Sequence, residues 1–184
     1  MKARIAQSAL IVVLLALTAG CGGDETVARV NDREVSEADV ERVFEHFEEE
    51  AAREGRELPE EGSAAQHNLE RNVLGLIVFR LQLEEAAAKL GIELDEDEIE
   101  ARVHDAEEAE GGEEEEGEEA KAAEAYFENA VTIQLLRERA AAELGGADAL
   151  DAWIAQATKD FPASYEDGWE PVGTGEPVPT VTVP

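Results

Sequence analysis

Cysteine, histidine and basic residues are scarce in this chain of 184 residues, and each shortage excludes a class of site. Cys21 is the single cysteine, so no intramolecular disulfide can form. The three histidines, His46, His67 and His104, fall on separate predicted helices, and without thiolates they do not make a zinc site. Glycine-rich phosphate loops and nucleophile elbows are also lacking. We therefore expect no metal, no cofactor and no catalytic residue, and no enzymatic activity.

Positive charge is the next shortage. Lysine and arginine together number 15 against 45 aspartates and glutamates, which gives a formal net charge of −30 at pH 7. Such a field repels the phosphates of nucleic acids and anionic lipid head groups. Nucleic acid is therefore excluded as a partner, and so is membrane attachment through a basic amphipathic helix.

Long apolar runs are lacking as well. The run of residues 9–19 is shorter than the ~20 residues that a bilayer-spanning helix needs. It follows Lys2 and Arg4, and this order is typical of a secretion signal. We therefore predict a signal peptide over residues 1–20.

The end of this signal, Leu17-Thr18-Ala19-Gly20-Cys21, resembles the lipobox of bacterial lipoproteins. The resemblance implies a diacylglyceryl group and fatty acyl chains such as palmitate on Cys21, with residues 21–26 as a lipidated tether. It also implies a protein anchored to the cell membrane and facing the extracytoplasmic space, whether periplasm or cell exterior. The alternative is ordinary cleavage after Gly20, which would leave a free thiol on a secreted protein.

The first part of the mature chain predicts a strand followed by a helix. Residues 27–30 alternate as a short strand does, and Asn31-Asp32 is a turn signal. Ser36 is the predicted N-cap of a helix, with Asp39 placed to complete a capping box. Positions spaced by three and four give that helix one apolar face: Val40, Val43, Phe44, Phe47 and Ala51.

A longer helix is predicted over residues 64–90, and its centre, residues 73–83, is apolar on nearly every side. A helix of this kind is either buried or shares its surface with a partner. Gly91 is expected to end it in a left-handed conformation. Asp95 is then the predicted N-cap of a short helix, with Glu98 at the capping-box position.

The remaining segments complete one domain over residues 27–171. A glycine and glutamate tract, residues 111–119, predicts a mobile loop because it repels itself and buries nothing. Two further helices are predicted over residues 120–144 and 147–159. The proline-containing residues 172–184 predict a disordered tail.

Three stretches carry a resemblance to a known family. They are Val27-Ala28-Arg29-Val30-Asn31-Asp32-Arg33-Glu34-Val35-Ser36, the run from Leu76 through Lys89-Leu90-Gly91-Ile92 to Ile99, and the segment from Trp153-Ile154 to Trp169-Glu170-Pro171. In this order they resemble the chaperone domain of SurA/PrsA-type extracytoplasmic foldases. The chain looks like a lipoprotein form of this SurA N-terminal-like domain.

The resemblance implies a mainly α fold, a helical chaperone domain in which a small two-stranded sheet joins the N- and C-terminal segments. Residues 27–30 should then pair with residues near 163–166. Family members often carry a parvulin-type prolyl isomerase domain between the later helices. Here that position holds only the acidic tract and a helix, so the resemblance does not imply isomerase activity.

Apolar helix faces are where a binding function would lie. We predict that seven side chains line a crevice for exposed segments of client polypeptides: Phe44, Phe47, Leu76, Phe79, Leu83, Tyr126 and Phe127. The same stripes are also what a closed core requires, and the sequence leaves both interpretations open.

The predicted function is that of a membrane-anchored, ATP-independent chaperone, a holdase that binds unfolded, newly exported polypeptides without isomerase activity. The alternative is a structural or assembly lipoprotein that binds one dedicated protein partner. A third hypothesis is a degenerate foldase with residual isomerase activity.

Overall fold

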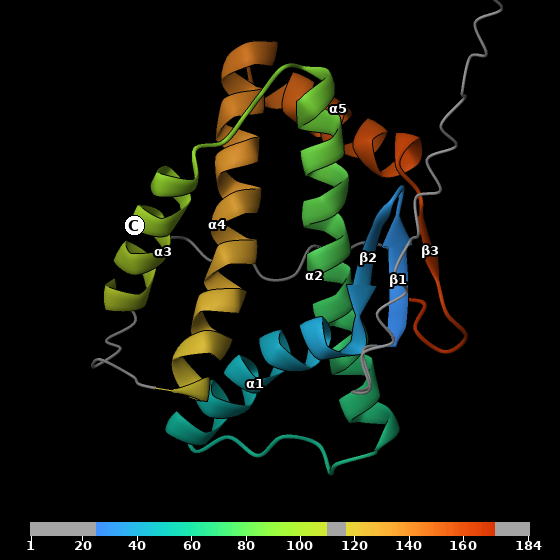
Figure 1. Ribbon diagram of the computed structural model, residues 1–184, viewed down its shortest axis with the longest axis vertical. Coiled ribbons are helices and arrows are strands. Elements are labelled where there is room, and N and C mark those ends of the chain that lie inside the picture. The colour runs from blue at the N-terminus through green and yellow to red at the C-terminus, as the bar shows by residue number, and fades with distance from the viewer. Residues whose placement is uncertain (1–24, 110–116, 172–184) are drawn as a thin grey trace, which may run out of the picture.

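Five helices and three short strands make up the described part of the chain, which in this computed structural model is residues 25–109 and 117–171 (Figure 1). In chain order they are β1 (Thr26–Val30), β2 (Arg33–Ser36), α1 (Glu37–Arg53), α2 (Ala64–Lys89), α3 (Glu96–Ala109), α4 (Glu118–Leu144), α5 (Ala147–Asp160) and β3 (Ala163–Tyr165). The predicted signal peptide, Cys21, most of the acidic loop and the predicted tail lie outside the described residues. The mainly α fold class is confirmed.

The three strands form one antiparallel sheet in the order β2-β1-β3. Ala28 pairs with Tyr165 and Val30 with Ala163, so the predicted joining of the N- and C-terminal segments is confirmed. The sheet has three strands and not two, because the tight turn at Asn31 also returns β2 onto β1, where Val30 pairs with Arg33.

Helix α1 starts at the predicted cap. The Ser36 hydroxyl accepts a hydrogen bond from the Asp39 amide (3.2 Å), and the Asp39 carboxylate accepts one from the Ser36 amide (3.0 Å). This reciprocal pair satisfies two donors that a helix N-terminus would otherwise leave open.

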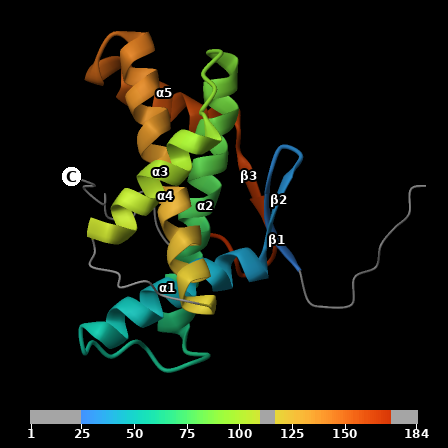
Figure 2. The ribbon, with the colours of Figure 1, turned by 60° about the vertical axis from the view of Figure 1, so that its left-hand side comes forward.

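Helices α2 and α4 are the two longest elements and lie side by side, with α1 across one end of the pair and α5 across the other (Figures 1 and 2). Helix α2 contacts α4, α1, α5 and both strands of the N-terminal hairpin. Its apolar centre is therefore buried on most sides, and Leu74 and Leu83 are fully enclosed. Gly91 follows its end with a positive φ of 72°, as predicted.

Two details of the later helices differ from the sequence-based prediction. Glu98 does not serve as the expected capping-box acceptor; both of its carboxylate oxygens accept from the Arg139 guanidinium (2.9 and 2.8 Å), which joins α3 to α4. Helix α4 begins at Glu118 and not at Ala120, inside the tract predicted to be a loop. Glutamates in a first helical turn are favoured by the helix dipole, so this end of the tract can be helical.

His46 is a core residue between α1 and α4. Its side chain is 1% exposed, and its ring stacks on Tyr126 with 4.5 Å between centroids. Phe47 and Phe127 meet the same ring edge-on. Burial, with the charge of Arg53 as a second cause, lowers the pKa of His46 to about 4.

This lowered pKa predicts loss of stability in mild acid. The unfolded chain binds a proton on His46 near its ordinary pKa of 6.5, while the folded chain resists protonation down to about 4. The free energy of unfolding therefore has its full value, as far as His46 is concerned, above about pH 6.5. It falls as the pH drops towards 4, because the unfolded chain then binds the proton that the folded chain does not. At about pH 5 the loss should be about 2 kcal/mol.

Urea unfolding at neutral pH and at about pH 5 measures this effect. His46→Phe should reduce the pH dependence by about 2 kcal/mol, whereas His104→Gln, at an exposed position of α3, should leave it unchanged. Equal pH dependence in the wild type and His46→Phe would show that His46 is not buried as a neutral ring.

Candidate functional site

The structure divides the seven predicted client-binding residues into two groups. Five are buried in the hydrophobic core: Phe44, Leu76, Leu83, Tyr126 and Phe127. Phe47 and Phe79 are partly buried and pack against that core. The predicted crevice between the helices is therefore closed, and the apolar faces on which it was based are packed against each other.

An aromatic cluster is responsible for much of this closure. Phe47 of α1 meets Tyr126 of α4 edge-on at 5.1 Å, and Tyr126 meets Phe127 at 5.3 Å. His46 completes the cluster between the two helices. Pairs of this kind contribute about 0.5–1.5 kcal/mol each beyond the area they bury. They hold α1 against α4.

On its other side, α1 borders an open hollow of about 590 Å³. We call it the acidic groove. It lies between α1, the loop that leads to α2, the first turns of α2 and the C-terminal segment. Its lining is Glu37, Val40, Glu41, Phe44, Glu45, Glu48, Pro59, Glu61, Gln66, Glu70 and Trp169.

The wall of the acidic groove follows from helical periodicity. Glu37, Glu41, Glu45 and Glu48 are spaced by four, four and three residues, which places them along one side of α1. Val40 and Phe44 lie between them and are buried in the core, so their surfaces form the base of the hollow. The groove thus has carboxylate walls and an apolar base.

Trp169 reaches the acidic groove from the far end of the chain. The antiparallel pairing of β3 with β1 directs the following residues back towards the start of α2. There the Gly168 carbonyl lies 3.2 Å from Nε2 of His67, and Arg71 donates to the Glu170 carbonyl (3.2 Å). The Trp169 ring meets the His67 ring edge-on at 5.2 Å. These contacts hold a half-buried indole at the edge of the groove.

Negative charge in the acidic groove is largely uncompensated. Partial burial raises the pKa of Glu48, and the neighbouring charges of Glu45, Glu61, Glu70 and Glu41 add to the effect. Glu70 does contact a histidine, with 2.9 Å between its carboxylate and Nδ1 of His67. Within residues 25–109 and 117–171, however, Glu41, Glu45, Glu48 and Glu61 form no ion pair with a lysine or arginine.

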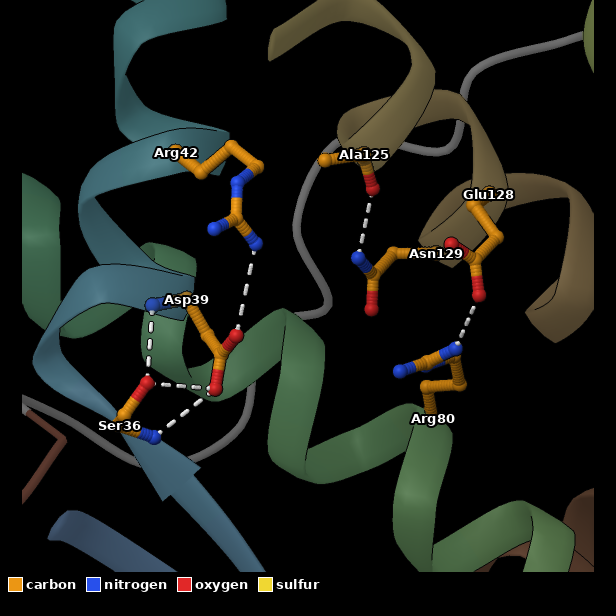
Figure 3. A network of polar contacts seen from close by, with 7 residues as sticks. All are labelled: Ser36, Asp39, Arg42, Arg80, Ala125, Glu128 and Asn129. Atoms are coloured by element: carbon orange, nitrogen blue, oxygen red, sulfur yellow. Dashed lines mark hydrogen bonds and ion pairs between the residues drawn. The ribbon is translucent and has the colours of Figure 1, made fainter. Parts of the chain in front are cut away.

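A smaller cleft of about 170 Å³ lies on the opposite side of α1, where α1, α2 and α4 meet (Figure 3). Its charges are matched: Arg42 pairs with Asp39 (3.6 Å) and Arg80 with Glu128 (2.9 Å). Asn129 donates to the Ala125 carbonyl of its own helix (2.7 Å). Because its arginines already have carboxylate partners, this cleft is a structural junction.

Comparison with known proteins gives the family. The model of the SurA-like N-terminal domain matches residues 2–138. The chain belongs to this family. No curated protein and no solved structure matches it. This match confirms the family suggested by the three sequence stretches. SurA-like domains are chaperone-like and bind polypeptides.

The family match ends within α4, yet the SurA-like domain of this chain continues beyond it. Helix α5 contacts α2 and α4, and β3 completes the sheet. The buried Gln82 side chain donates to the Phe161 carbonyl (2.9 Å), which fixes the passage from α5 to β3. Between α3 and α4 only residues 110–117 intervene, too few for an inserted isomerase domain.

Two further observations concern the described residues of this SurA-like domain. Over residues 25–109 and 117–171, no three histidine, cysteine or acidic side chains are placed to hold a metal ion. None of the helices in these ranges has the length and apolarity needed to cross a bilayer.

Sequence reasoning did not identify the acidic groove. The regular glutamates of residues 37–48 were a usable signal, but in a chain this acidic they resemble any solvated helix face. The loop residues Pro59 and Glu61 and the distant Trp169 join them only through folding.

Core placement of Phe127 predicts a large destabilisation when its ring is removed. Phe127 is 2% exposed, so Phe127→Ala should lower the free energy of unfolding by about 3–5 kcal/mol through lost burial and a cavity. Phe79→Ala is the matched control: this ring is partly exposed, and its loss should cost about half as much or less. Urea denaturation measures both. Equal small losses would contradict the closed core.

Proposed function

We propose that this chain is a membrane-anchored, ATP-independent chaperone, a holdase that captures unfolded, newly exported polypeptides. Membership of a chaperone-like family supports this proposal. The observation that carries it is the acidic groove, an open hollow of about 590 Å³ with carboxylate walls and a narrow apolar base.

Capture in this proposal is weak and reversible. The exposed apolar area at the base of the groove is small because Val40 and Phe44 are only 1% and 5% exposed. Weak binding suits a holdase, which must release its client for folding. The acidic surface keeps the chaperone soluble and prevents self-association. Neither ATP hydrolysis nor prolyl isomerisation takes part.

The anchor in this proposal is lipid on Cys21, with the domain facing the extracytoplasmic space. A net charge of −30 repels anionic lipid surfaces, so electrostatic attraction would not hold the domain at a membrane. Strand β1 begins at Thr26, only five residues after Cys21 in the sequence. The folded domain would therefore stay close to the bilayer.

A dedicated partner is the second candidate function. It is favoured by the burial of five of the seven predicted binding residues, which leaves little apolar surface for many different clients. A structural or assembly lipoprotein of this kind would bind one protein tightly and specifically.

Replacing Cys21 with serine tests the anchor. The wild-type chain should be found in the membrane fraction with a mass increased by its acyl groups, because stable attachment takes at least two acyl chains. Cys21→Ser should remove the added mass and move the protein into the soluble extracytoplasmic fraction. Thr18→Ser, a control within the signal, should behave as the wild type. A soluble wild-type protein without added mass would contradict lipidation.

Suppression of aggregation tests the chaperone. An unfolded model protein diluted from denaturant should scatter less light when the chain from residue 21, with Cys21→Ser, is present at a stoichiometric ratio. Added ATP should make no difference. A folded acidic protein of similar charge should give no suppression. If the well-folded chain also gives none, the dedicated-partner function would be the better account.

A further inference from the structure

We infer that the acidic groove selects client segments in which lysine or arginine lies next to apolar side chains. This inference rests on the proposed function and specifies its substrate class. Its basis is charge complementarity between the groove walls and a cationic segment, combined with an apolar base.

The walls supply the selectivity. Four carboxylates of the groove, those of Glu41, Glu45, Glu48 and Glu61, lack a lysine or arginine partner among the described residues. Like charges gathered in a hollow repel one another, and this repulsion adds to partial burial, the larger cause, in raising the pKa of Glu48. A bound cationic side chain relieves it, whereas an acidic segment increases it. Discrimination therefore comes from attraction and repulsion together.

The base of the groove suits the methylene chains of lysine and arginine. Lysine and arginine bury their methylene groups along apolar surface while the charged head stays at its polar rim. Pro59, Trp169 and the small exposed part of Phe44 offer such a surface beside the carboxylates, whereas Val40 is 1% exposed and belongs to the core. Trp169 at the edge can also receive a cation over its ring face.

The same charge distribution explains why the chain would not occupy its own groove. Acidic residues outnumber basic ones three to one over the whole sequence, 45 to 15. A second copy of this chain would present mostly carboxylates to the groove and be repelled. The groove therefore stays open to exported polypeptides that carry positive charge.

Two peptides with identical apolar positions test the selectivity, one with lysines and the other with glutamates at the intervening positions. The full chain, purified from membranes into nanodiscs of zwitterionic lipid, should bind the lysine peptide at least about ten-fold more tightly in fluorescence anisotropy. Raising the salt concentration should reduce this preference because the walls are exposed to solvent. Equal binding of the two peptides would overturn the inference.

Matched double variants separate the groove from the general field. Glu45→Gln with Glu48→Gln should weaken lysine-peptide binding about three- to ten-fold, since two exposed ion pairs are lost. Glu100→Gln with Glu124→Gln removes the same charge at exposed positions on α3 and α4, outside the groove, and should change binding less than about two-fold. Equal weakening by both would show that net charge, and not the groove, attracts the peptide.

Tryptophan fluorescence locates the bound peptide. The chain has two tryptophans, so Trp153→Phe leaves Trp169 as the only reporter. Its emission should shift on addition of the lysine peptide and stay constant with the glutamate peptide. If aggregation is suppressed but Trp169 does not respond and the groove variants bind normally, the proposed function stands and this inference fails. If no unfolded protein is captured at all, the proposed function itself fails.

Discussion

Burial of α2 on most of its sides is the constraint on which the rest of this structure depends. Helix α4 covers one side of it, the hairpin of β1 and β2 another, and α1 and α5 lie across its two ends. The fully enclosed Leu74 and Leu83 show how complete this cover is. Each covering element buries its own apolar stripe against α2, so none of them would be stable without it. Closing this core also closes the crevice that the apolar sequence suggested.

Charged and buried side chains occupy different parts of this domain, and the acidic groove lies at a boundary between them. Apolar side chains occupy the interior, while carboxylates cover the outer sides of the helices. Several arginines form pairs that join elements, such as Arg139 with Glu98 and Arg80 with Glu128. No such pair neutralises Glu45 or Glu48 within residues 25–109 and 117–171.

Local signals in the sequence were reliable wherever they depended on neighbouring residues. The Ser36 and Asp39 capping box, the turn at Asn31 and the helix end at Gly91 follow from chemistry within a few positions. Pairing of residues 27–30 with residues near 163–166 came instead from a family resemblance, because nothing local predicts a contact between the two ends of a domain. The sheet has a third strand, β2, and α4 starts two residues earlier than predicted.

By itself, the sequence determined the fold class, the helix boundaries to within a few residues and a strongly acidic surface, because periodicity, capping and charge are local properties. Only the tertiary structure decided whether Phe44, Tyr126 and Phe127 form a groove or a core, since an apolar stripe looks the same in both until its neighbour is known. It also decided that Trp169 lies beside glutamates of α1. That site exists because β3 pairs with β1. Bringing the two ends of the domain together costs conformational entropy, which only the packing of the whole domain offsets.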